Sequence, residues 1–461
     1  MDTPLNIKKT KEGLLAKKFS AVELVSEYLS RIEKANPELN CFLTVSKDLA
    51  YSQAKNADKL INEYGDKVLE DKPLLGVTVA HKDLFLTKGI RTTASSRVLE
   101  SYVPAYSATV VDRLEEAGCI LLGKTNCDAW AHGASGENSD FGPAKNPWNK
   151  DFVPGGSSSG SAAAVSADLT LIATGTDTGG SIRQPANFCG VVGFKPTYGA
   201  VSRYGIVAMA SSLDCVGHIT KSVEDAERVF GVTRGEDYRD STVKNSKLEI
   251  KNSKLKLGIP KEYFVEGIDK EVERSVLEAV KVFKKQNVEI REISLPHTKY
   301  AISVYYIIQP AEVSSNLGRY DGIRYGNDRG SFGDEAKRRI MLGTYVLSAG
   351  YYDAYYLQAQ KVRTQVIEDF NKAFLEVDAI IAPVSPTPPF KLGEKADSPL
   401  EMYLADIFTV AANVAGIPGL AIPSGLTKSG LPLGFQLLGP RFSETCLFEL
   451  GKLYQQSTDW K

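Results

Sequence analysis

Serine occurs among glycines at two places in the sequence, and this combination can support acyl-transfer chemistry. The first cluster is Gly155–Ser161 (GGSSSGS) and the second is Asp177–Ser181 (DTGGS). A serine hydroxyl is a weak nucleophile until a base activates it, and glycine lets backbone N–H groups converge on one point. The Thr-Gly-Gly-Ser turn could therefore present Ser181 as a nucleophile beside donors for an oxyanion. Gly/Ser clusters are also typical of flexible linkers, but here an apolar helix and strand follow at once.

The base for such a serine must come from elsewhere, because no histidine lies between Gly155 and Lys195. Lys82 is the candidate, since it follows an apolar run and has apolar residues close on both sides. Burial disfavours the charged form of lysine. A drop of about three units from the ordinary pKa of about 10.4 would leave Lys82 largely neutral near pH 7, at a cost of about 4 kcal/mol. The alternative is a lysine at a strand end that keeps its ammonium group in water.

Two other motifs compete for the same region. Gly156–Gly160 fits the G-x-S-x-G pattern of a nucleophile elbow, which would make Ser158 the attacking residue. That arrangement needs a downstream acid and histidine, and only His218 and His297 follow. Residues 118–125 (GCILLGKT) match the phosphate-loop pattern, but a true phosphate loop follows a strand and opens a helix. Here a helix precedes the motif and its middle residues are apolar, so we predict a buried strand instead.

Hydrophobic periodicity predicts strands alternating with helices around these residues, which is typical of an α/β fold. A capping box at Ser20 opens a helix that should end at Asn36-Pro37. Residues 123–153 should form a long loop or lid, and 236–256, where KNSKL occurs twice, a surface insertion. Strands are predicted at 41–45, 74–80, 119–122, 169–173, 255–259, 288–293, 379–382 and 420–423, with short strand-like runs between 196 and 209. Helices are predicted at 47–63, 107–117, 162–165, 223–230, from Asp269 onward, within 299–374 and at 443–456.

Composition narrows the class of protein. We find no boundary that divides the chain, so residues 1–461 should form one domain, with the catalytic core at about 70–220. The 55 basic and 56 acidic residues give a net charge of −1. Binding to the phosphates of nucleic acid needs a surplus of basic residues, so the composition argues against a protein whose main role is to bind nucleic acid. The six cysteines include no CxxC pair and no metal-site spacing, which is typical of free thiols in a reducing compartment. No signal pattern or bilayer-spanning run occurs. These features predict a cytoplasmic protein without a metal site.

Two stretches of the sequence resemble a known family. The block GGSSSGSAAAVSADLTLIATGTDTGGSIRQPANFCGVVGFKPTYG and the upstream GVTVAHKDLF are similar to those of the amidase signature family. The resemblance implies a single large α/β domain with a central mixed, twisted β-sheet covered by helices on both faces. It also implies a triad in which Ser181 is the nucleophile, Ser157 is a bridging serine on a cis peptide and Lys82 is the base. The oxyanion would be bound by the N–H groups of Thr178, Gly179, Gly180 and Ser181, and no cofactor would be needed.

Segments 202–220, 316–326, 337–356 and 402–419 resemble one branch of that family more closely, the glutaminase subunits of glutamine-dependent Glu-tRNA(Gln)/Asp-tRNA(Asn) amidotransferases. This likeness implies that glutamine is the substrate. Arg339 would bind its α-carboxylate and Asp406 its α-ammonium, while Tyr305 and Gly133 would line the pocket. From the residues alone, Lys337-Arg338-Arg339 is more often a solvated basic helix face.

The same likeness implies partners. Ammonia would pass to a tRNA-binding partner subunit (B) that uses ATP and Mg²⁺ to activate the misacylated amino acid. A small clasp subunit (C) would complete a heterotrimer, with no membrane involved. Two alternatives stay open, namely a stand-alone amidase for another small amide and a non-catalytic scaffold, although the intact Lys82, Ser157 and Ser181 argue against the scaffold.

The sequence departs from the family pattern at several positions. Ala129 stands where an acidic residue is usual and His132 where methionine is usual. The stretch from Arg324 to Lys337 is shorter than usual, and Cys215 and His218 replace other residues. The first two changes fall in a segment that should wall the glutamine pocket, so His132 is either a substrate contact or a pocket-wall residue without a chemical role.

Overall fold

Short apolar runs of the sequence form eleven strands of one sheet in the computed structural model, which describes residues 5–244, 255–264, 267–324 and 326–459. In chain order the strands are β1 (Phe42–Val45), β2 (Thr78–Lys82), β3 (Ile120–Thr125), β4 (Ile172–Asp177), β5 (Val192–Lys195), β6 (Cys215–Thr220), β7 (Lys256–Pro260), β8 (Glu289–Ile293), β9 (Ala379–Pro383), β10 (Gly419–Leu426) and β11 (Pro432–Leu438).

The sheet is mixed and continuous from one half of the chain to the other. Its spatial order is β1-β3-β2-β4-β6-β5-β10-β11-β9-β7-β8. β2 pairs in parallel with both β3 and β4, while β4–β6, β6–β5 and β5–β10 pair antiparallel. Because β10 lies beside β5, the C-terminal strands extend the sheet formed by the N-terminal ones. The prediction of one α/β domain with a mixed sheet is confirmed.

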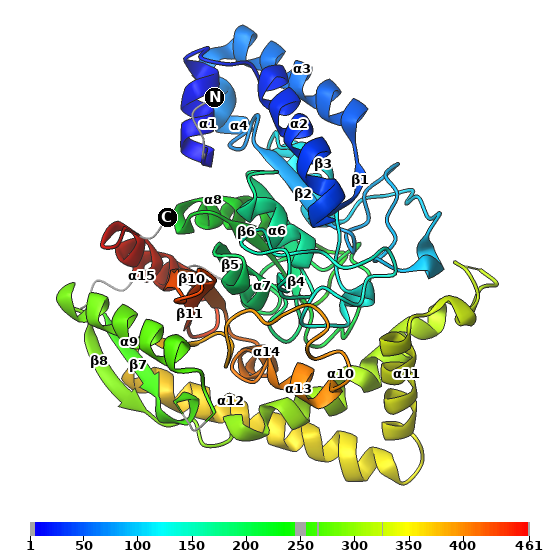
Figure 1. Cartoon of the computed structure of the whole chain (residues 1–461), viewed down its shortest axis with the longest axis vertical. Helices are drawn as coiled ribbons and strands as arrows, with labels where there is room; N and C mark the ends of the chain where they lie inside the picture. The colour runs from blue at the N-terminus through cyan, green and yellow to red at the C-terminus, as the bar shows by residue number, and fades with distance from the viewer. Residues whose placement is uncertain (1–4, 245–254, 265–266, 325, 460–461) are drawn as a thin grey trace.

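Helices cover both faces of this sheet (Figure 1). They are α1 (Ile7–Leu15), α2 (Ala21–Leu39), α3 (Lys47–Tyr64), α4 (Val68–Asp71), α5 (Thr109–Glu116), α6 (Ser159–Ser166), α7 (Arg183–Phe188), α8 (Val223–Thr233), α9 (Lys270–Lys285), α10 (Ala301–Asn316), α11 (Asp334–Val346), α12 (Gln358–Glu376), α13 (Pro399–Leu404), α14 (Val410–Ala415) and α15 (Glu444–Gln456). Neighbouring residues of β5 show the two faces. A side chain at Gly193 would meet Ala186 of α7, whereas the Phe194 ring packs on Phe230 of α8 and Phe448 of α15. Successive residues of a strand point to opposite faces, so these helices lie on opposite sides.

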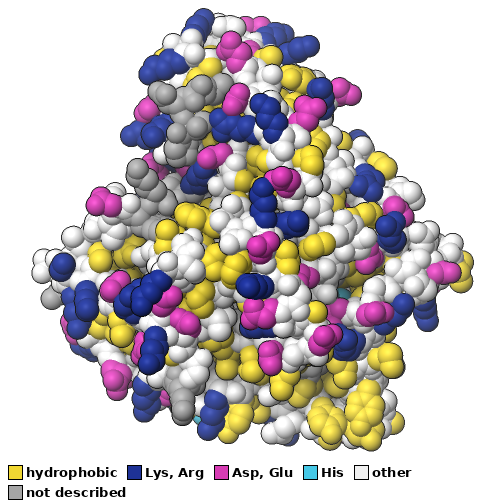
Figure 2. Space-filling model, viewed as in Figure 1, with side chains coloured by type: hydrophobic (Ala, Val, Ile, Leu, Met, Phe, Trp, Pro, Cys, Tyr) yellow, Lys and Arg dark blue, Asp and Glu magenta, His cyan; other side chains and the backbone are white. Residues whose placement is uncertain are grey.

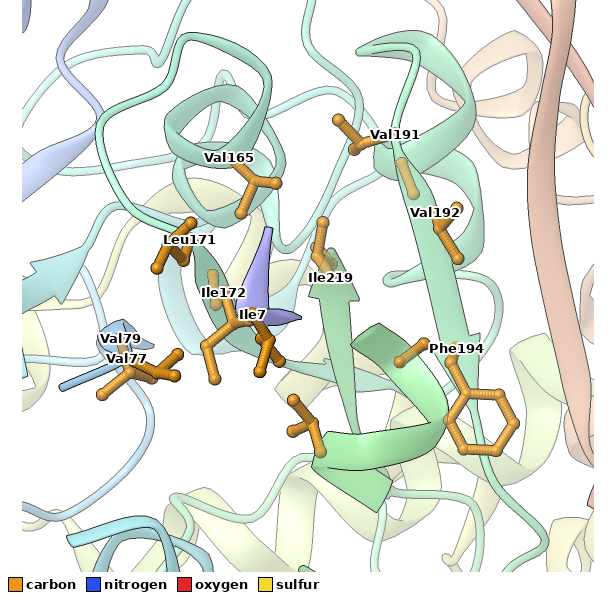
Figure 3. Close-up of a cluster of buried hydrophobic side chains, with 14 of the residues drawn as sticks. Ile7, Val77, Val79, Val165, Leu171, Ile172, Val191, Val192, Phe194 and Ile219 are labelled. Atoms are coloured by element: carbon orange, nitrogen blue, oxygen red, sulfur yellow. The ribbon is translucent and has the colours of Figure 1, made fainter. Parts of the chain in front are cut away.

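The core beside the central strands is apolar. Val79, Ile172, Ile219 and Phe194 lie on adjacent strands, and all are buried (Figure 3). Val165 of α6 belongs to the same buried cluster. Burying each such side chain contributes about 1.5–3 kcal/mol, so the strand ends that follow this core are firmly held.

Two strand boundaries differ from the predicted ones in a way that matters for the site. β2 begins at Thr78 rather than Leu74, because the preceding residues form turns in which Leu75 N–H and Val77 N–H donate to Lys72 O and Leu74 O. At its other end β2 continues past Ala80 and ends on Lys82 itself, because His81 and Lys82 pair with residues of β3.

β3 extends to Thr125 and is buried throughout, so residues 118–125 do not form a phosphate loop. The side chain of Lys124, the lysine of that motif, is buried. It donates to Thr92 Oγ1 at 2.7 Å and pairs with Asp83 at 3.6 Å.

Other expectations need correction. α2 does not end at Asn36-Pro37 but runs to Leu39 with Pro37 inside it, because Asn40 N–H donates to Asn36 O at 2.8 Å and Asn40 adopts a left-handed cap. β5, β6 and β11 were not predicted, since glycine and polar residues interrupt their apolar pattern, and the runs predicted between 196 and 209 form no strand of the sheet.

The predicted insertion at 236–256 is described only in part. Asp237 accepts a hydrogen bond from Ser202 Oγ, and Lys244 N–H donates to Gly199 O. Residues 245–254 lie outside the described residues. The described helices include none long and apolar enough to cross a membrane.

Candidate active site

Lys82 is the last residue of β2 and lies where the carboxyl ends of the parallel strands β2, β3 and β4 meet. Its side chain is fully buried. Lys82 Nζ lies 2.8 Å from Ser157 Oγ, 3.0 Å from Ser158 Oγ and 2.9 Å from Thr176 Oγ1. Burial lowers the pKa of Lys82 to about 8, so about a tenth of the molecules carry a neutral amine at pH 7. A neutral amine has one lone pair, so one of these hydroxyls can donate to it.

The first Gly/Ser cluster brings Ser157 and Ser158 against this lysine. The Gly156–Ser157 peptide bond is cis. Gly156 N–H donates to Gln184 Oε1 at 2.9 Å, and Ser158 N–H donates to Ser181 O at 3.1 Å. These bonds attach the cluster to α7 and to the second Gly/Ser cluster, so the two clusters face each other across a few ångströms.

The second cluster is a turn between β4 and α7, which we call the 178–181 turn. Gly180 has φ +143°, and a methyl group on it would lie only 2.2 Å from Thr409 Oγ1, so a residue without a side chain is required here. Ser181 is 8% exposed, whereas Lys82 and Ser157 are fully buried. Within the described part of the chain, the N–H groups of residues 178–181 donate to no protein acceptor, so these donors remain for a ligand oxygen.

The proposed relay of protons is only partly assembled. Lys82 Nζ and Ser157 Oγ are hydrogen-bonded. No hydrogen bond joins Ser157 Oγ to Ser181 Oγ among the residues that the structure describes, although the two segments are joined through Ser158 N–H and Ser181 O. Catalytic hydrogen bonds are often long in the free enzyme and tighten when substrate binds, so this geometry is compatible with the relay.

A buried ion pair that sequence reasoning missed holds the ends of the 178–181 turn. Arg183 Nη2 lies 3.1 Å from Asp177 Oδ1, and Arg183 also binds Gln436 Oε1 and Asn413 Oδ1 at 2.7 and 2.6 Å. Burial alone would raise the pKa of Asp177, but Arg183 outweighs it and lowers this pKa to about 2. Both charged residues belong to the motif DTGGSIR. Because the surrounding sequence is otherwise mostly apolar, two opposite charges six residues apart could have indicated a buried ion pair.

The predicted substrate residues fall into two groups. Tyr305 on α10 and Asp406 lie against the turn, because a methyl group on Gly179 would meet the Tyr305 hydroxyl at 3.0 Å and one on Gly180 would meet Asp406 Oδ1 at 3.3 Å. Gly133 and Arg339 instead line a neighbouring cavity of about 230 Å³. Its other lining residues are Ala134, Ser135, Glu137, Asn138, Tyr306, Glu335, Arg338, Lys395, Ala396, Pro399, Met402 and Tyr403.

Arg339 is not part of a solvated basic face. It is 3% exposed, and its Nε and Nη1 bind Glu335 Oε1 and Gln309 Oε1, each at 2.8 Å. Nη2 has no hydrogen-bond partner among the described residues. The guanidinium group is therefore held on one side and available on the other.

Burial shifts the pKa values of two titratable groups, Asp406 and His132, towards their neutral forms. Burial raises the pKa of Asp406 well above its usual range. Burial and the charge of Arg339 lower the pKa of His132 well below its usual range, so this imidazole is neutral. Both ring nitrogens of His132 are buried without a partner in the described part of the chain.

The rival arrangement, a nucleophile elbow with Ser158 as the attacking residue, lacks the histidine that it needs. Ser158 Oγ is fully buried and bound by Lys82. His218 Nε2 is instead bonded to Thr233 Oγ1 at 2.8 Å, and His297 Nδ1 to Asp369 Oδ1 at 2.9 Å. In the same described part, no group of three or more His, Cys, Asp or Glu side chains is arranged to hold a metal ion.

The fold and this buried lysine–serine arrangement are compatible with an enzyme that hydrolyses amides. A family model described as Amidase matches residues 23–448. The chain belongs to the amidase family, and it is an enzyme of that family.

Relatives sharpen the comparison. A protein of Carboxydothermus hydrogenoformans is 50% identical over 478 residues, which is 99% of this chain and 98% of that protein. A protein of Nitrosococcus oceani is 50% identical over 470 residues, which is 97% of this chain and 96% of that protein. Both are described as the A subunit of glutamyl-tRNA(Gln) amidotransferase.

Solved structures agree with the fold. The protein of the same name from Thermotoga maritima is 40% identical with a TM-score of 0.83, covering 100% of this chain and 97% of that one. A peptide amidase from Stenotrophomonas maltophilia is 26% identical with a TM-score of 0.82, covering 99% and 97%. The fold is thus shared by proteins that are named for different activities.

Proposed function

We propose that this chain hydrolyses the side-chain amide of glutamine and supplies the ammonia to a tRNA-dependent amidotransferase. The observation that carries the proposal is the 2.8 Å hydrogen bond between buried Lys82 Nζ and Ser157 Oγ, beside the turn that bears Ser181. The relatives described as A subunits of glutamyl-tRNA(Gln) amidotransferase support the wider reaction, since they match nearly the whole chain.

The chemistry follows from the positions of the three residues. Ser181 Oγ attacks the amide carbon while its proton passes to Ser157 and the proton of Ser157 passes to the neutral amine of Lys82. The carbonyl oxygen becomes an oxyanion, which the free N–H groups of the 178–181 turn stabilise. The proton then returns through Ser157 to the nitrogen, the C–N bond breaks and ammonia leaves. Water attacks the remaining Ser181 ester by the same relay and releases glutamate.

The same region offers one charge of each sign for a zwitterionic amino acid. Arg339 has its Nη2 free among the described residues, and a guanidinium fork suits a carboxylate. Asp406 lies beside the turn without a hydrogen-bond donor in the described part of the chain. Its pKa is raised by burial, and an ammonium group bound next to it would favour the ionised form. Tyr305 and Gly133 would complete the pocket wall.

The proposal includes partners. Ammonia would pass to a tRNA-binding subunit that uses ATP and Mg²⁺, with a small third subunit clasping the two, in the cytoplasm where translation occurs. A group of exposed apolar side chains on the α11–α12 hairpin supports an association of this kind, because large exposed apolar patches usually mark interfaces. Figure 2 shows hydrophobic side chains gathered over the lower end of this hairpin. The group comprises Met341, Leu342, Tyr345, Leu347, Tyr351, Tyr352, Tyr355 and Leu357.

The test is ammonia release from glutamine by the purified chain, alone and with co-expressed partner subunits, with Ser181→Ala as the control. We expect release that depends on Ser181 and rises when the partners are present. Ser181-dependent hydrolysis of other small amides without any release from glutamine would instead identify a stand-alone amidase. Release that is unchanged in Ser181→Ala would contradict the proposed nucleophile.

A further inference from the structure

Two side chains outside the 178–181 turn hold it by hydrogen bonds in the described part of the chain. Thr409 Oγ1 donates to Gly179 O at 2.6 Å. On the other side, Thr178 Oγ1 donates to Asp214 Oδ1 at 2.8 Å, and both of these side chains are buried. Asp214 does not touch Lys82, Ser157 or Ser181 through any hydrogen bond that the structure describes, so its effect on the turn passes through Thr178.

Asp214 is itself held firmly. Its Oδ2 accepts Met209 N–H at 3.0 Å and its Oδ1 accepts Ala210 N–H at 3.2 Å. It directly precedes β6, whose first residue, Cys215, lies opposite Asp177 of β4. The carboxylate is thus placed level with the start of the turn, at the end of a paired strand.

The segment 209–214 also connects the turn to the helical layer. Asn316 of α10 donates to Met209 O at 3.0 Å, Glu312 of α10 accepts Ser212 N–H at 2.8 Å, and Arg363 of α12 donates to Ser212 O at 3.1 Å. Tyr305 of α10 lies against Gly179 of the turn. The turn is therefore in contact with α10 through Tyr305 and with the 209–214 segment through Asp214.

We propose that Asp214 is a positioning residue for hydrolysis. It fixes Thr178, and through Thr178 the direction of the N–H donors that bind the oxyanion. The inference rests on the proposed function, because it assumes that the turn binds the oxyanion of an acyl-transfer reaction. Misplacing such donors by about an ångström is expected to slow the chemical step by about 10- to 100-fold, whereas binding of ground-state glutamine should change little.

The experiment compares Thr178→Val, Asp214→Asn and their combination, measuring kcat and KM for ammonia release from glutamine by the chain with its co-expressed partners. Each single change should lower kcat about 10- to 100-fold and leave KM within about threefold. The double variant should be no slower than the worse single variant, because both break one interaction. Thr178→Ser keeps the hydroxyl and should restore kcat. Ser212→Ala removes, in the same segment, a hydroxyl group that is bonded to Glu312 and Arg363. It leaves the backbone bonds of Ser212 and the Thr178–Asp214 bond in place, so kcat should be unchanged.

Several results would overturn the inference. These are an unchanged kcat in Thr178→Val, losses that multiply in the double variant, or a Thr178→Ser variant as slow as Thr178→Val. If Asp214→Asn does not fold, Thr178→Val and Thr178→Ser still decide the matter. If hydrolysis depends on Ser181 but kcat is unchanged in the Thr178 variants, only this inference is overturned. If Ser181→Ala hydrolyses glutamine at the full rate, the proposed function is overturned as well.

Discussion

At the scale of single residues, the unusual feature is the environment of Lys82. Three hydroxyl groups contact its ammonium group, and no carboxylate in the described part of the chain forms an ion pair with it. The oxygens of Ser157, Ser158 and Thr176 lie within 3.0 Å of Lys82 Nζ. Hydroxyl groups solvate an ammonium ion less well than water does, so burial is the dominant effect and the pKa falls to about 8. A carboxylate in their place would have raised the pKa and removed the base.

The pH dependence of hydrolysis follows from this value. The proposed proton relay requires neutral Lys82, and the neutral fraction falls about tenfold for each pH unit below the pKa. We expect kcat for glutamine hydrolysis to rise about tenfold from pH 6 to pH 7 and to level off above about pH 9. Lys82→Arg stays charged and should be inactive across this range. A profile that is flat from pH 6 to 9 would rule out Lys82 as the base.

Arg339 allows a second test at this scale. Arg339→Met should raise KM for glutamine at least about tenfold, because a charge-assisted hydrogen bond contributes about 1.5–3 kcal/mol. Hydrolysis of a small amide without an α-carboxylate should be the same in this variant and in the wild type. Lys337→Met, on the exposed side of the same helix, is the matched control and should leave KM unchanged. Equal losses for both amide substrates would show that Arg339 acts on the fold instead.

At the scale of elements, the site depends on how β4, the 178–181 turn and α7 are joined. The Asp177–Arg183 pair bridges the end of β4 and the start of α7. Arg183 binds α14 and β11 as well, through Asn413 and Gln436. The turn is therefore anchored to elements that lie more than 200 residues away along the chain.

Breaking this pair should destabilise the protein strongly. Arg183→Met leaves Asp177 buried without its partner, and we expect the free energy of unfolding to fall by about 3–5 kcal/mol at pH 7. Asp177 has a folded pKa of about 2, so its contribution is full above the unfolded value of about 3.9 and is lost as the pH falls towards 2. Urea unfolding should therefore show a difference from the wild type that shrinks below about pH 4.

Arg31→Met removes a surface pair with Glu27 and serves as the control for this comparison. Its effect should stay below about 1 kcal/mol. A similar small loss in Arg183→Met would mean that the buried pair does not hold the turn.

At the scale of the whole molecule, the two halves of the chain build one site. Lys82, Ser157 and Ser181 all belong to the first half, whereas Thr409, Asn413 and Gln436, which hold the turn and Arg183, belong to the second. The antiparallel pairing of β5 with β10 joins the halves within one sheet.

A divided chain tests this dependence. A fragment of residues 1–250 carries all three proposed catalytic residues but lacks the partners of Arg183, so we expect it to release no ammonia from glutamine. Co-expression with residues 251–461 should restore activity, because the cut falls in the predicted surface insertion, where breaks are well tolerated. Circular dichroism and co-purification would establish whether the two fragments associate. Activity in the first fragment alone would show that the second half is not needed to hold the turn.

The sequence by itself determined the class of fold and indicated candidate residues for chemistry, because these are local patterns. Strand and helix periodicity indicated the α/β alternation. The Gly/Ser clusters and the apolar segment around Lys82 indicated Ser181 and Lys82, while Ser157 was added by the resemblance to the amidase signature family. The apolar centre of residues 118–125 excluded a phosphate loop, and the structure confirms a strand there. β5, β6 and β11 were not predicted, because their glycines and polar residues interrupt the alternation of apolar and polar side chains that identifies a strand.

Only the tertiary structure decided which distant groups meet these residues. Asp214 reaches Thr178 across 36 residues, and Arg183 reaches Gln436 across 253. It also decided that Arg339 is buried and braced rather than solvated. Contacts of this kind depend on strand order and on packing between elements, and neither leaves a periodic trace in the local sequence. The identity of the chemical groups is thus a local property of the sequence, while their positions are set by the sheet that brings the two halves together.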